Sequence, residues 1–216
     1  MLISYNHRFL FVHIAKAAGS SIEEGLAQFR PPLTGNKIRK RLVLLGSLNR
    51  IGGLYRHAEF GQHATLAGAR SVLPPEVFES LYKFAFVRNP WDRMVSRYHF
   101  LQKNTKHHRH QMIQEMNNFD DYLDWELKRN GMHQFGMVTD GEGRLLTDFI
   151  GYFERLEEDF AQICSHLSLD ARLPHRNKTR HSDYRTYYSD KGREKVAQFF
   201  KKDIELFGYT FDGIVT

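Results

Sequence analysis

The stretch "FVHIAKAAGSSIEEGL", residues 11–26, joins an apolar segment to a polar, helix-forming one. With the residues before it, the apolar part is "RFLFVHIA" (Arg8 to Ala15), a nearly continuous run that predicts a strand covered on both faces. "SSIEEGLAQF" then offers serine as an N-cap and glutamate in the first turn, which predicts the start of a helix. The chain is therefore expected to pass from a buried strand into a helix across a turn of small residues.

A second strand–helix unit follows further along the chain. "KFAFVR" (Lys83 to Arg88) is an apolar run of strand length, and "NPWDRMVSRYHFLQKN" carries the signals of a helix start. Asn89 can cap this helix, Pro90 fits its first position, and Asp92 stands where a capping box has an acidic residue. Two such units predict an α/β fold in which a central parallel sheet is flanked by helices.

The rest of the chain is mostly helical in pattern. Short helices are predicted at "LAGARSVL" and "PEVFESL". Three longer helices are predicted: one at "FDDYLDWELKRN", a second that ends at about Leu167, and a third from about Lys191 to Phe207. A hairpin is predicted around Asp140-Gly141. We assign no secondary structure to the basic segment from Arg30 to Tyr55. We therefore expect a helical C-terminal part to follow the sheet.

Length and composition are those of an ordinary globular protein. The chain has 216 residues, of which 41% are hydrophobic and 26% charged, so we expect a single domain over residues 1–216. Cys164 is the sole cysteine, which excludes an intrachain disulfide and a cysteine-based zinc site. No apolar run has the length of a membrane span, and the first strand begins too early to leave room for a signal peptide, so we expect a cytoplasmic protein. The net charge of +6 indicates an anionic ligand without choosing among nucleotide, polysaccharide and nucleic acid.

The turn after the first strand has the composition of an anion site. N–H groups at a helix start lack partners within the helix, and the helix dipole adds positive charge there. Gly19 allows close approach of the backbone, Ser20 and Ser21 supply hydroxyls, and Lys16 supplies a charge. Lys16 precedes the glycine, so this is not a Walker motif. The pattern predicts a phosphate or sulfate cradle, and a turn of small residues that serves packing alone is the alternative.

Arg88 and Ser96 form a second candidate anion site. Arg88 ends its strand, at the kind of sheet edge where α/β proteins bind ligands, and Ser96 lies two turns along the next helix. Together they can hold one phosphate from two sides. The alternatives are an Arg88–Asp92 ion pair and a serine hydroxyl bonded to its own helix.

The two motifs together resemble those of a known enzyme family. "HIAKAAGSSIE" and "FVRNPWDRMVSRY" resemble the carbohydrate sulfotransferases that use 3'-phosphoadenosine-5'-phosphosulfate (PAPS). Those enzymes have a 5'-phosphosulfate loop of the type H-I-P-K-T-A-G-T-S and a 3'-phosphate motif of the type F-V-R-N-P-x-x-R-x-x-S-x-Y. "DFIGYFERLEEDFAQI", "LPHRNKT" and "YYSDKGREKVAQFFKKDIELFGYTF" are similar to segments of small bacterial members. The likeness spans nearly the whole chain and implies a P-loop-like fold.

The resemblance also implies which residues hold the donor. Those implied for the 5'-phosphosulfate are Lys16, Gly19, Ser20 and Ser21, those for the 3'-phosphate are Arg88 and Ser96, and those implied to close over the nucleotide are Lys178 and Arg180 in "NKTR". Ala15 and Ala17 depart from the proline and threonine that are typical of the loop, and the missing threonine hydroxyl removes one donor to the phosphate. The sulfuryl transfer that the resemblance implies requires no metal.

Sulfuryl transfer to a hydroxyl also needs a base. Lys16 is suited to stabilise charge on the leaving group, and a histidine is suited to take the proton of the acceptor. His63, in "EFGQHATLAGAR", follows a glycine and precedes Thr65, a candidate helix cap, which places it at a strand-to-helix turn. It also matches the Gly-His segment that carries the base in related polysaccharide sulfotransferases. We expect His63 to be the base, with Glu59 and His57 as reserves, and a turn histidine bonded to a backbone carbonyl is the alternative.

Other histidines fit structural roles better. His13 shares the alternation of Phe9 and Phe11 and is expected to be packed in the core. "HHRH" (His107 to His110) offers metal-ligand chemistry, but sequential residues rarely converge on one ion, so a polar loop or an acceptor-binding patch is favoured.

We therefore expect a PAPS-dependent sulfotransferase that acts on a hydroxyl of a carbohydrate or another hydroxyl-bearing acceptor. A small-molecule kinase is one alternative, although neither a Walker lysine nor an acidic Mg²⁺ ligand at a strand end is evident. The other is a non-catalytic, basic binder of polysaccharide or nucleic acid, which leaves the two anion cradles unexplained.

Overall fold

Four strands form the main sheet of the computed structural model, in the order β1-β2-β3-β4. The structure describes residues 1–30, 43–129, 133–174 and 182–215. β1 (Leu2–Ser4) pairs antiparallel with β2 (Phe9–Val12), whereas β2 pairs parallel with β3 (Tyr82–Val87), and β3 with β4 (Phe149–Tyr152). The predicted α/β class, with a central parallel sheet flanked by helices, is confirmed.

The chain divides into two compact units, Met1–Val87 with Gln134–His175 and Arg88–His133 with Arg176–Thr216. The helices of the first unit are α1 (Gly19–Gly25), η1 (Ala27–Phe29), η2 (Val43–His57), α3 (Leu66–Val72), α4 (Pro75–Ser80), α8 (Phe135–Val138), η3 (Phe153–Arg155) and α9 (Leu156–His166). The second unit holds α5 (Pro90–Lys103), α6 (His110–Gln114), α7 (Phe119–Glu126), η4 (Tyr184–Tyr187), α10 (Asp190–Phe199), α11 (Lys201–Phe207) and the small hairpin of β5 (Tyr209–Thr210) and β6 (Gly213–Ile214). The prediction of one domain over residues 1–216 stays a prediction.

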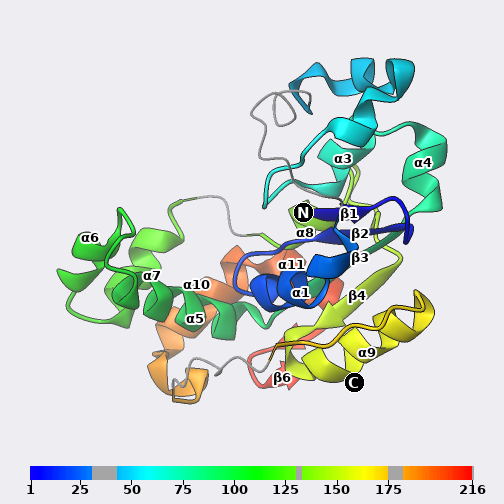
Figure 1. The fold of residues 1–216 in the computed structure, drawn as a ribbon. Helices are drawn as coiled ribbons and strands as arrows, with labels where there is room; N and C mark the ends of the chain where they lie inside the picture. Colours follow the sequence, from blue (N-terminus) through cyan, green and yellow to red (C-terminus); the bar gives the residue numbers. More distant parts are fainter. Residues whose placement is uncertain (31–42, 130–132, 175–181, 216) are drawn as a thin grey trace. The chain divides into compact units, whose positions relative to one another are not determined.

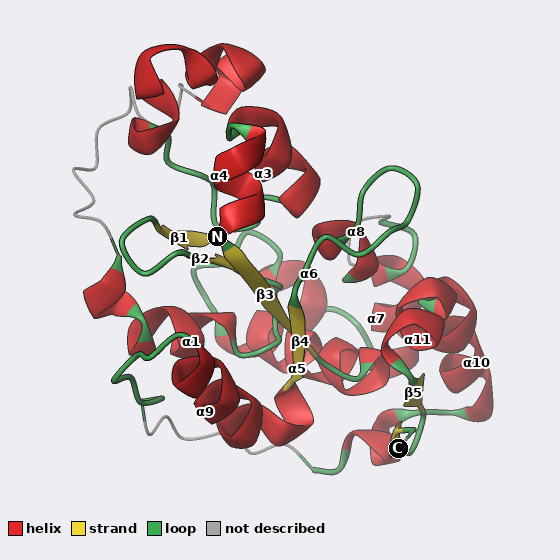
Figure 2. Ribbon diagram, turned by 90° about the vertical axis from the view of Figure 1, so that its right-hand side faces the viewer, coloured by secondary structure: helices red, strands yellow, loops and turns green. Residues whose placement is uncertain are grey.

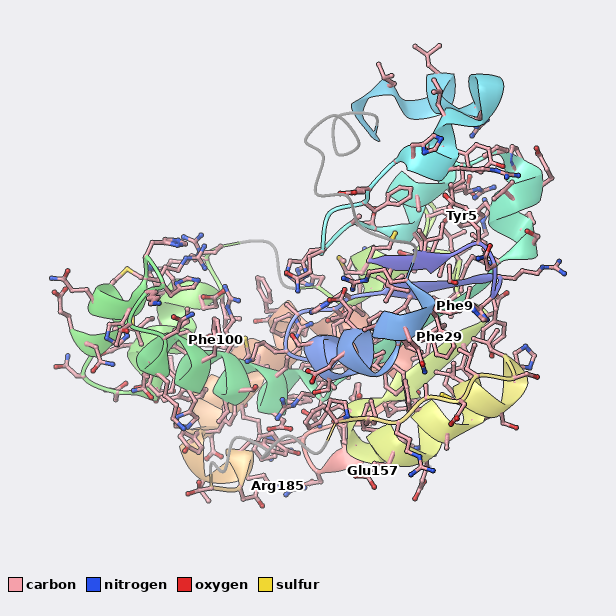
Figure 3. The ribbon with its side chains drawn as sticks, viewed as in Figure 1. Tyr5, Phe9, Phe29, Phe100, Glu157 and Arg185 are labelled. Atoms are coloured by element: carbon pink, nitrogen blue, oxygen red, sulfur yellow. The ribbon has the colours of Figure 1, made fainter. Side chains whose placement is uncertain are left out.

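In the first unit, helices lie on both sides of the sheet. Figures 1 and 2 show α1 and α9 together on one side and α3 and α4 on the other. The apolar core under α1 and α9 is made by alternate strand residues and by one face of each helix: Phe9, Phe11, Phe84, Phe86, Ile22, Leu26, Phe160 and Ile163. Phe29 packs against this core, whereas Glu157 is on the exposed face of α9 (Figure 3). All four residues of β2 are fully buried, as the continuous apolar run predicts.

Gly151 allows β4 to lie beside β3 in this core. A Cβ atom at Gly151 would come within 2.6 Å of the Phe86 ring. The glycine therefore makes room for the large side chain of the neighbouring strand.

The second unit is built around α5. Asn89 caps this helix by accepting the Trp91 N–H at 3.0 Å, and Pro90 occupies the first position, both as predicted. Its apolar face packs with α7 and α10 in a second core that includes Trp91, Tyr122 and Phe200. Arg93 is fully buried under the Phe200 ring, and burial lowers the pKa of its guanidinium to about 10 against the opposing effect of Asp203.

Three local predictions differ from the structure. α1 begins at Gly19, and its N-cap is Ala18 in a left-handed conformation with no side-chain cap, not a serine. The turn around Asp140 forms, but its strands pair only through the isolated bridge Thr139↔Leu145, because the chain then leaves to form β4 in the main sheet. The final helix is broken at Phe200 into α10 and α11. Within the described ranges, no helix combines the length and apolarity that crossing a membrane requires.

Candidate active site

The loop between β2 and α1, residues 13–18, carries two non-glycine residues in the left-handed region. Lys16 has a φ of 67° and Ala18 a φ of 61°. Such a conformation costs roughly 1–2 kcal/mol per residue because Cβ approaches the carbonyl oxygen. Strain of this kind is typical of functional loops, where the surrounding structure enforces the conformation.

This loop presents backbone N–H groups that have no partner among the described residues. The Ala17 N–H donates back to the Ile14 carbonyl at 3.4 Å, and the N–H groups of Ser21 and Ile22 donate to the Ala18 carbonyl at 3.0 and 3.1 Å. In the part of the chain that the structure describes, the N–H groups of Ala18, Gly19 and Ser20 donate no hydrogen bond. Successive free N–H groups in a strained loop are suited to hold an anionic group.

The side chains around this loop have suitable chemistry. Lys16 and Ser21 are half-buried, and Ser20 is exposed. The hydroxyls of Ser20 and Ser21 bond to no other described residue, so they remain available as donors. The donor set of this turn, one cation with hydroxyl and amide groups, fits a phosphosulfate.

Gly19 has a second reason to be glycine. A Cβ atom there would lie 2.4 Å from Cδ2 of His13, closer than any real contact of that kind. The imidazole of His13 therefore occupies the space over Gly19. Packing, as well as approach of an anion, requires a residue without a side chain at this position.

His63 lies next to the same loop. It stands in the turn before α3, whose N-cap is Thr65 as expected, since the Gly68 N–H donates to the Thr65 hydroxyl at 3.1 Å. The imidazole is exposed, and its Nδ1 lies 3.1 Å from the carbonyl oxygen of His13. The two imidazole rings meet edge to face, with centroids 5.1 Å apart.

The bond to the carbonyl fixes the tautomer of His63. A carbonyl oxygen only accepts, so Nδ1 of His63 carries the proton and Nε2 of the neutral ring holds a lone pair. The expectation that His63 is a base and the alternative that it is a turn histidine bonded to a backbone carbonyl are therefore compatible. The bond to a backbone carbonyl prepares the other nitrogen to accept a proton.

His13 is buried beneath this arrangement, as expected. Its side chain is 5% exposed, and its Nδ1 lies 3.2 Å from Glu23 Oε1. Burial lowers the pKa of His13, and His63 adds to this effect, whereas the bond to Glu23 opposes it. Sequence reasoning missed Glu23, although its position four residues after Gly19 places both on one face of α1.

In the second unit, Arg88 and Ser96 are both buried at 6% exposure. Nε and Nη2 of Arg88 each lie 2.8 Å from Asp92 Oδ2, so the ion pair that the spacing allows is formed. The Ser96 hydroxyl makes no hydrogen bond to the described residues, so the alternative of a serine bonded to its own helix is not observed. Asp92 and Ser96 share one face of α5, and Arg88 directly follows β3.

Other candidate residues are placed as follows. Lys178 and Arg180 lie outside the described residues. His57 is exposed and Glu59 is half-buried. In "HHRH", the rings of His107 and His108 stack at 4.5 Å, and His110 begins α6. Among the described residues, no three His, Cys, Asp or Glu side chains are grouped so that they could hold a metal ion.

Known proteins resemble this chain in sequence. The model of the family described as "Sulfotransferase family" matches residues 1–210. An uncharacterized protein of Archaeoglobus fulgidus is 30% identical over 119 residues, which are 53% of this chain and 90% of that relative. The family match includes both strand–helix units, the loop of Lys16 and the turn of His63. The chain therefore belongs to the sulfotransferase family.

Proposed function

We propose that this protein transfers a sulfuryl group from PAPS to a hydroxyl of an acceptor, which we take to be a carbohydrate. One observation carries the proposal most directly. The loop with free N–H groups and the ring of His63 are joined through a single residue, His13, which contacts Gly19 with its ring and His63 with its carbonyl. An anion cradle and a base fixed to each other are what transfer from a charged donor to a hydroxyl needs.

The residues of the loop would hold the reacting end of the donor. When bound, PAPS supplies an activated sulfuryl group whose bond to the phosphate oxygen breaks as a bond to the acceptor oxygen forms. The N–H groups of Gly19 and Ser20, with the Ser20 and Ser21 hydroxyls, would bind the phosphosulfate, and Lys16 would neutralise charge on the phosphate that leaves. Because Ala17 directs its N–H to Ile14, it contributes no donor.

His63 would act on the acceptor. Its Nε2 lone pair accepts the proton of the attacking hydroxyl, while the bond from Nδ1 to His13 keeps the ring in the productive tautomer. The charge that develops on the imidazole is next to a carbonyl dipole that favours it. Burial lowers the pKa of His13, which disfavours a second positive charge beside the His63 ring.

The 3'-phosphate of the donor is assigned to Arg88 and Ser96, and the closing contacts to Lys178 and Arg180. Arg88 is held by Asp92, which fixes the plane of the guanidinium before any ligand arrives. The free Ser96 hydroxyl, four residues beyond Asp92, supports a role as a donor.

Thermal stability with nucleotides tests the proposal. We would compare 3'-phosphoadenosine-5'-phosphate, Mg²⁺–ATP and adenosine 5'-phosphate, each on the wild type and on Arg88→Ala. A ligand at one hundred times its Kd stabilises by about 2.7 kcal/mol, which raises Tm by about 2–4 °C for a chain of this size. The expected result is a shift with the bisphosphate alone that is absent in Arg88→Ala. A shift only with Mg²⁺–ATP would favour a kinase, and no shift with any nucleotide would favour a non-catalytic binder.

A further inference from the structure

A carboxylate of α1 lies beside the buried ring of His13. Glu23 Oε1 is 3.2 Å from Nδ1 of His13, whose side chain is only 5% exposed. At the other ring nitrogen there is no spare room, since a Cβ atom at Gly19 would lie 2.5 Å from Nε2. Gly19 and Glu23 stand one turn apart on α1. One helix therefore encloses both nitrogens of this imidazole.

The carboxylate of Glu23 is itself held in place. Its Oε2 lies 3.7 Å from Nη2 of Arg30, and its Oε1 lies 3.8 Å from the amino group of Met1. The Glu23 side chain is 18% exposed, so solvent screens these ion pairs only in part. Glu23 thus faces His13 with a carboxylate whose position is fixed from two further sides.

Glu23 and Gln62 compete for the same nitrogen of His13. Nε2 of Gln62 lies 3.4 Å from His13 Nδ1 and can only donate, whereas the nearer carboxylate oxygen can only accept. A lone pair on Nδ1 would face the carboxylate and be repelled by it. The nearer, charged group therefore draws the proton to Nδ1, and the Gln62 amide can turn its oxygen toward the ring. Burial lowers the pKa of His13, and the hydrogen bond to Glu23 is the largest effect in the opposite direction.

The ring of His13 in turn contacts the ring of His63. The two rings meet edge to face, with centroids 5.1 Å apart and planes at 89°. The ring of His63 is exposed, and its hydrogen bond to the His13 carbonyl leaves rotation about the axis of that bond free. The edge-to-face contact opposes this rotation, because aromatic pairs favour that arrangement. The direction of Nε2 of His63 therefore depends on how the ring of His13 stands.

We propose that Glu23 is a positioning residue of this site. It keeps the proton of His13 on Nδ1 and the ring in one orientation, and that ring keeps Nε2 of His63 in the direction in which it accepts a proton. Glu23 touches no reacting atom, and the proton taken from the acceptor stays on His63. This inference rests on the proposed function, because it gives a purpose to the orientation of a base.

Nitrogen-15 NMR of the histidine side chains tests the first step. At about pH 8 the imidazole of His13 is neutral, and its two nitrogens report which of them carries the proton. We expect the proton on Nδ1 in the wild type, in Gln62→Ala and in Glu23→Gln, whose amide oxygen still accepts. In Glu23→Ala the proton should move to Nε2 in most molecules, because Gln62 is then the remaining partner of Nδ1. The signals are assigned by their loss in His13→Gln.

The rate of sulfuryl transfer from PAPS tests the second step, with glycerol as the source of the acceptor hydroxyl. Glu23→Ala should lower kcat by about tenfold, less than the ~10²-fold that a displacement of about 1 Å costs, because the bond of His63 to the carbonyl remains. The Kd of 3'-phosphoadenosine-5'-phosphate should stay within about twofold of the wild-type value, because no group assigned to the donor is removed. Glu23→Gln should restore kcat.

Glu24→Ala is the matched control, since it removes an exposed acidic side chain from the same helix. It should leave the tautomer of His13 and kcat unchanged, and the Tm of each variant without ligand shows that it folds. The inference is overturned if wild-type His13 carries its proton on Nε2, if Glu23→Ala leaves the tautomer as it was, if Glu23→Gln is as slow as Glu23→Ala, or if Glu24→Ala is equally slow.

The two measurements separate this inference from the proposed function. NMR assigns the tautomer of His13 without any turnover, so it reads the contact with Glu23 directly. If the tautomer follows Glu23 as expected but His63→Ala transfers the sulfuryl group at the wild-type rate, the error lies in the proposed function, because His63 is then not the base.

Discussion

Nδ1 of His63 donates to the carbonyl oxygen of His13 across 3.1 Å, although the two residues are separated by 50 positions in the sequence. This bond joins the turn before α3 to the end of β2, one of the parallel strands of the sheet. It also leaves Nε2 of His63 as the acceptor nitrogen.

The first prediction follows from this bond. His63→Ala should lower turnover by about 10²- to 10⁴-fold, as expected for loss of a general base, while the thermal shift with 3'-phosphoadenosine-5'-phosphate is retained. His57→Ala, an exposed histidine just before the same turn, is the matched control and should leave turnover unchanged. If turnover is lost in the His57 variant and retained in the His63 variant, the prediction is wrong and His57 is the base.

Gly19 gives a prediction about stability. In Gly19→Ala the new Cβ meets the His13 ring at 2.4 Å, so the ring or the loop must move. We expect a loss of about 1–3 kcal/mol in the free energy of unfolding, measured with urea, because the site is overpacked.

Gly136→Ala is the control for Gly19. Gly136 lies in α8, and a Cβ there would meet nothing within 4 Å, so this change should stabilise by roughly 0.5–1 kcal/mol. Equal effects of the two substitutions would mean that the His13 ring does not require the glycine.

The third prediction concerns pH. The pKa of His13 is lowered in the folded protein, mainly by burial, so the unfolded chain binds a proton more readily. Stability is therefore greatest above the unfolded pKa of about 6.5 and falls as pH decreases through that value toward the folded one. Thermal unfolding between pH 8 and 5 should show a smaller loss in His13→Gln than in the wild type.

Glu23→Gln provides a second variant for the pH prediction. Glu23 opposes the lowering of the His13 pKa, so removing its charge should extend the loss of stability to lower pH. His133 and His107 also have lowered pKa values and contribute slopes of the same sign, which are common to all three proteins. Identical pH slopes in wild type and His13→Gln would contradict the assignment.

Cys164 gives a prediction about reactivity. The thiol is buried in the core of the first unit, and burial raises its pKa, so the thiolate fraction at neutral pH is reduced. Iodoacetamide should modify it much more slowly in the native protein than in urea, as followed by mass spectrometry. Equal rates in the two conditions would show that the core around α9 opens readily.

The sequence predicted those strands of the sheet that are long apolar runs followed by clear signals of a helix start. The runs of β2 and β3 satisfy this condition, and Asn89 with Pro90 marks the start of α5. β1 has three residues, too few for a period to be visible. β4 has its partner β3 about sixty residues earlier, so no local pattern shows that the segment pairs there and not within a hairpin.

The candidate site was predictable in its residue types and not in its contacts. Lys16 and Gly19 were identified by their position at a strand-to-helix turn. His63 was expected at such a turn as well, but this was wrong, because in the described residues the element before its turn is the helix η2 and not a strand. The free N–H groups depend on the left-handed conformations of Lys16 and Ala18, which residue type disfavours. The contact of the His13 ring with Gly19 depends on how α1 packs on β2, which is a tertiary property.

His13 has one further consequence, for motion. Its carbonyl holds His63, its ring covers Gly19, and both belong to a residue that is covalently continuous with β2. Because both contacts are made by one residue next to β2, we expect a displacement of that strand to move the loop at Gly19 and the ring of His63 together.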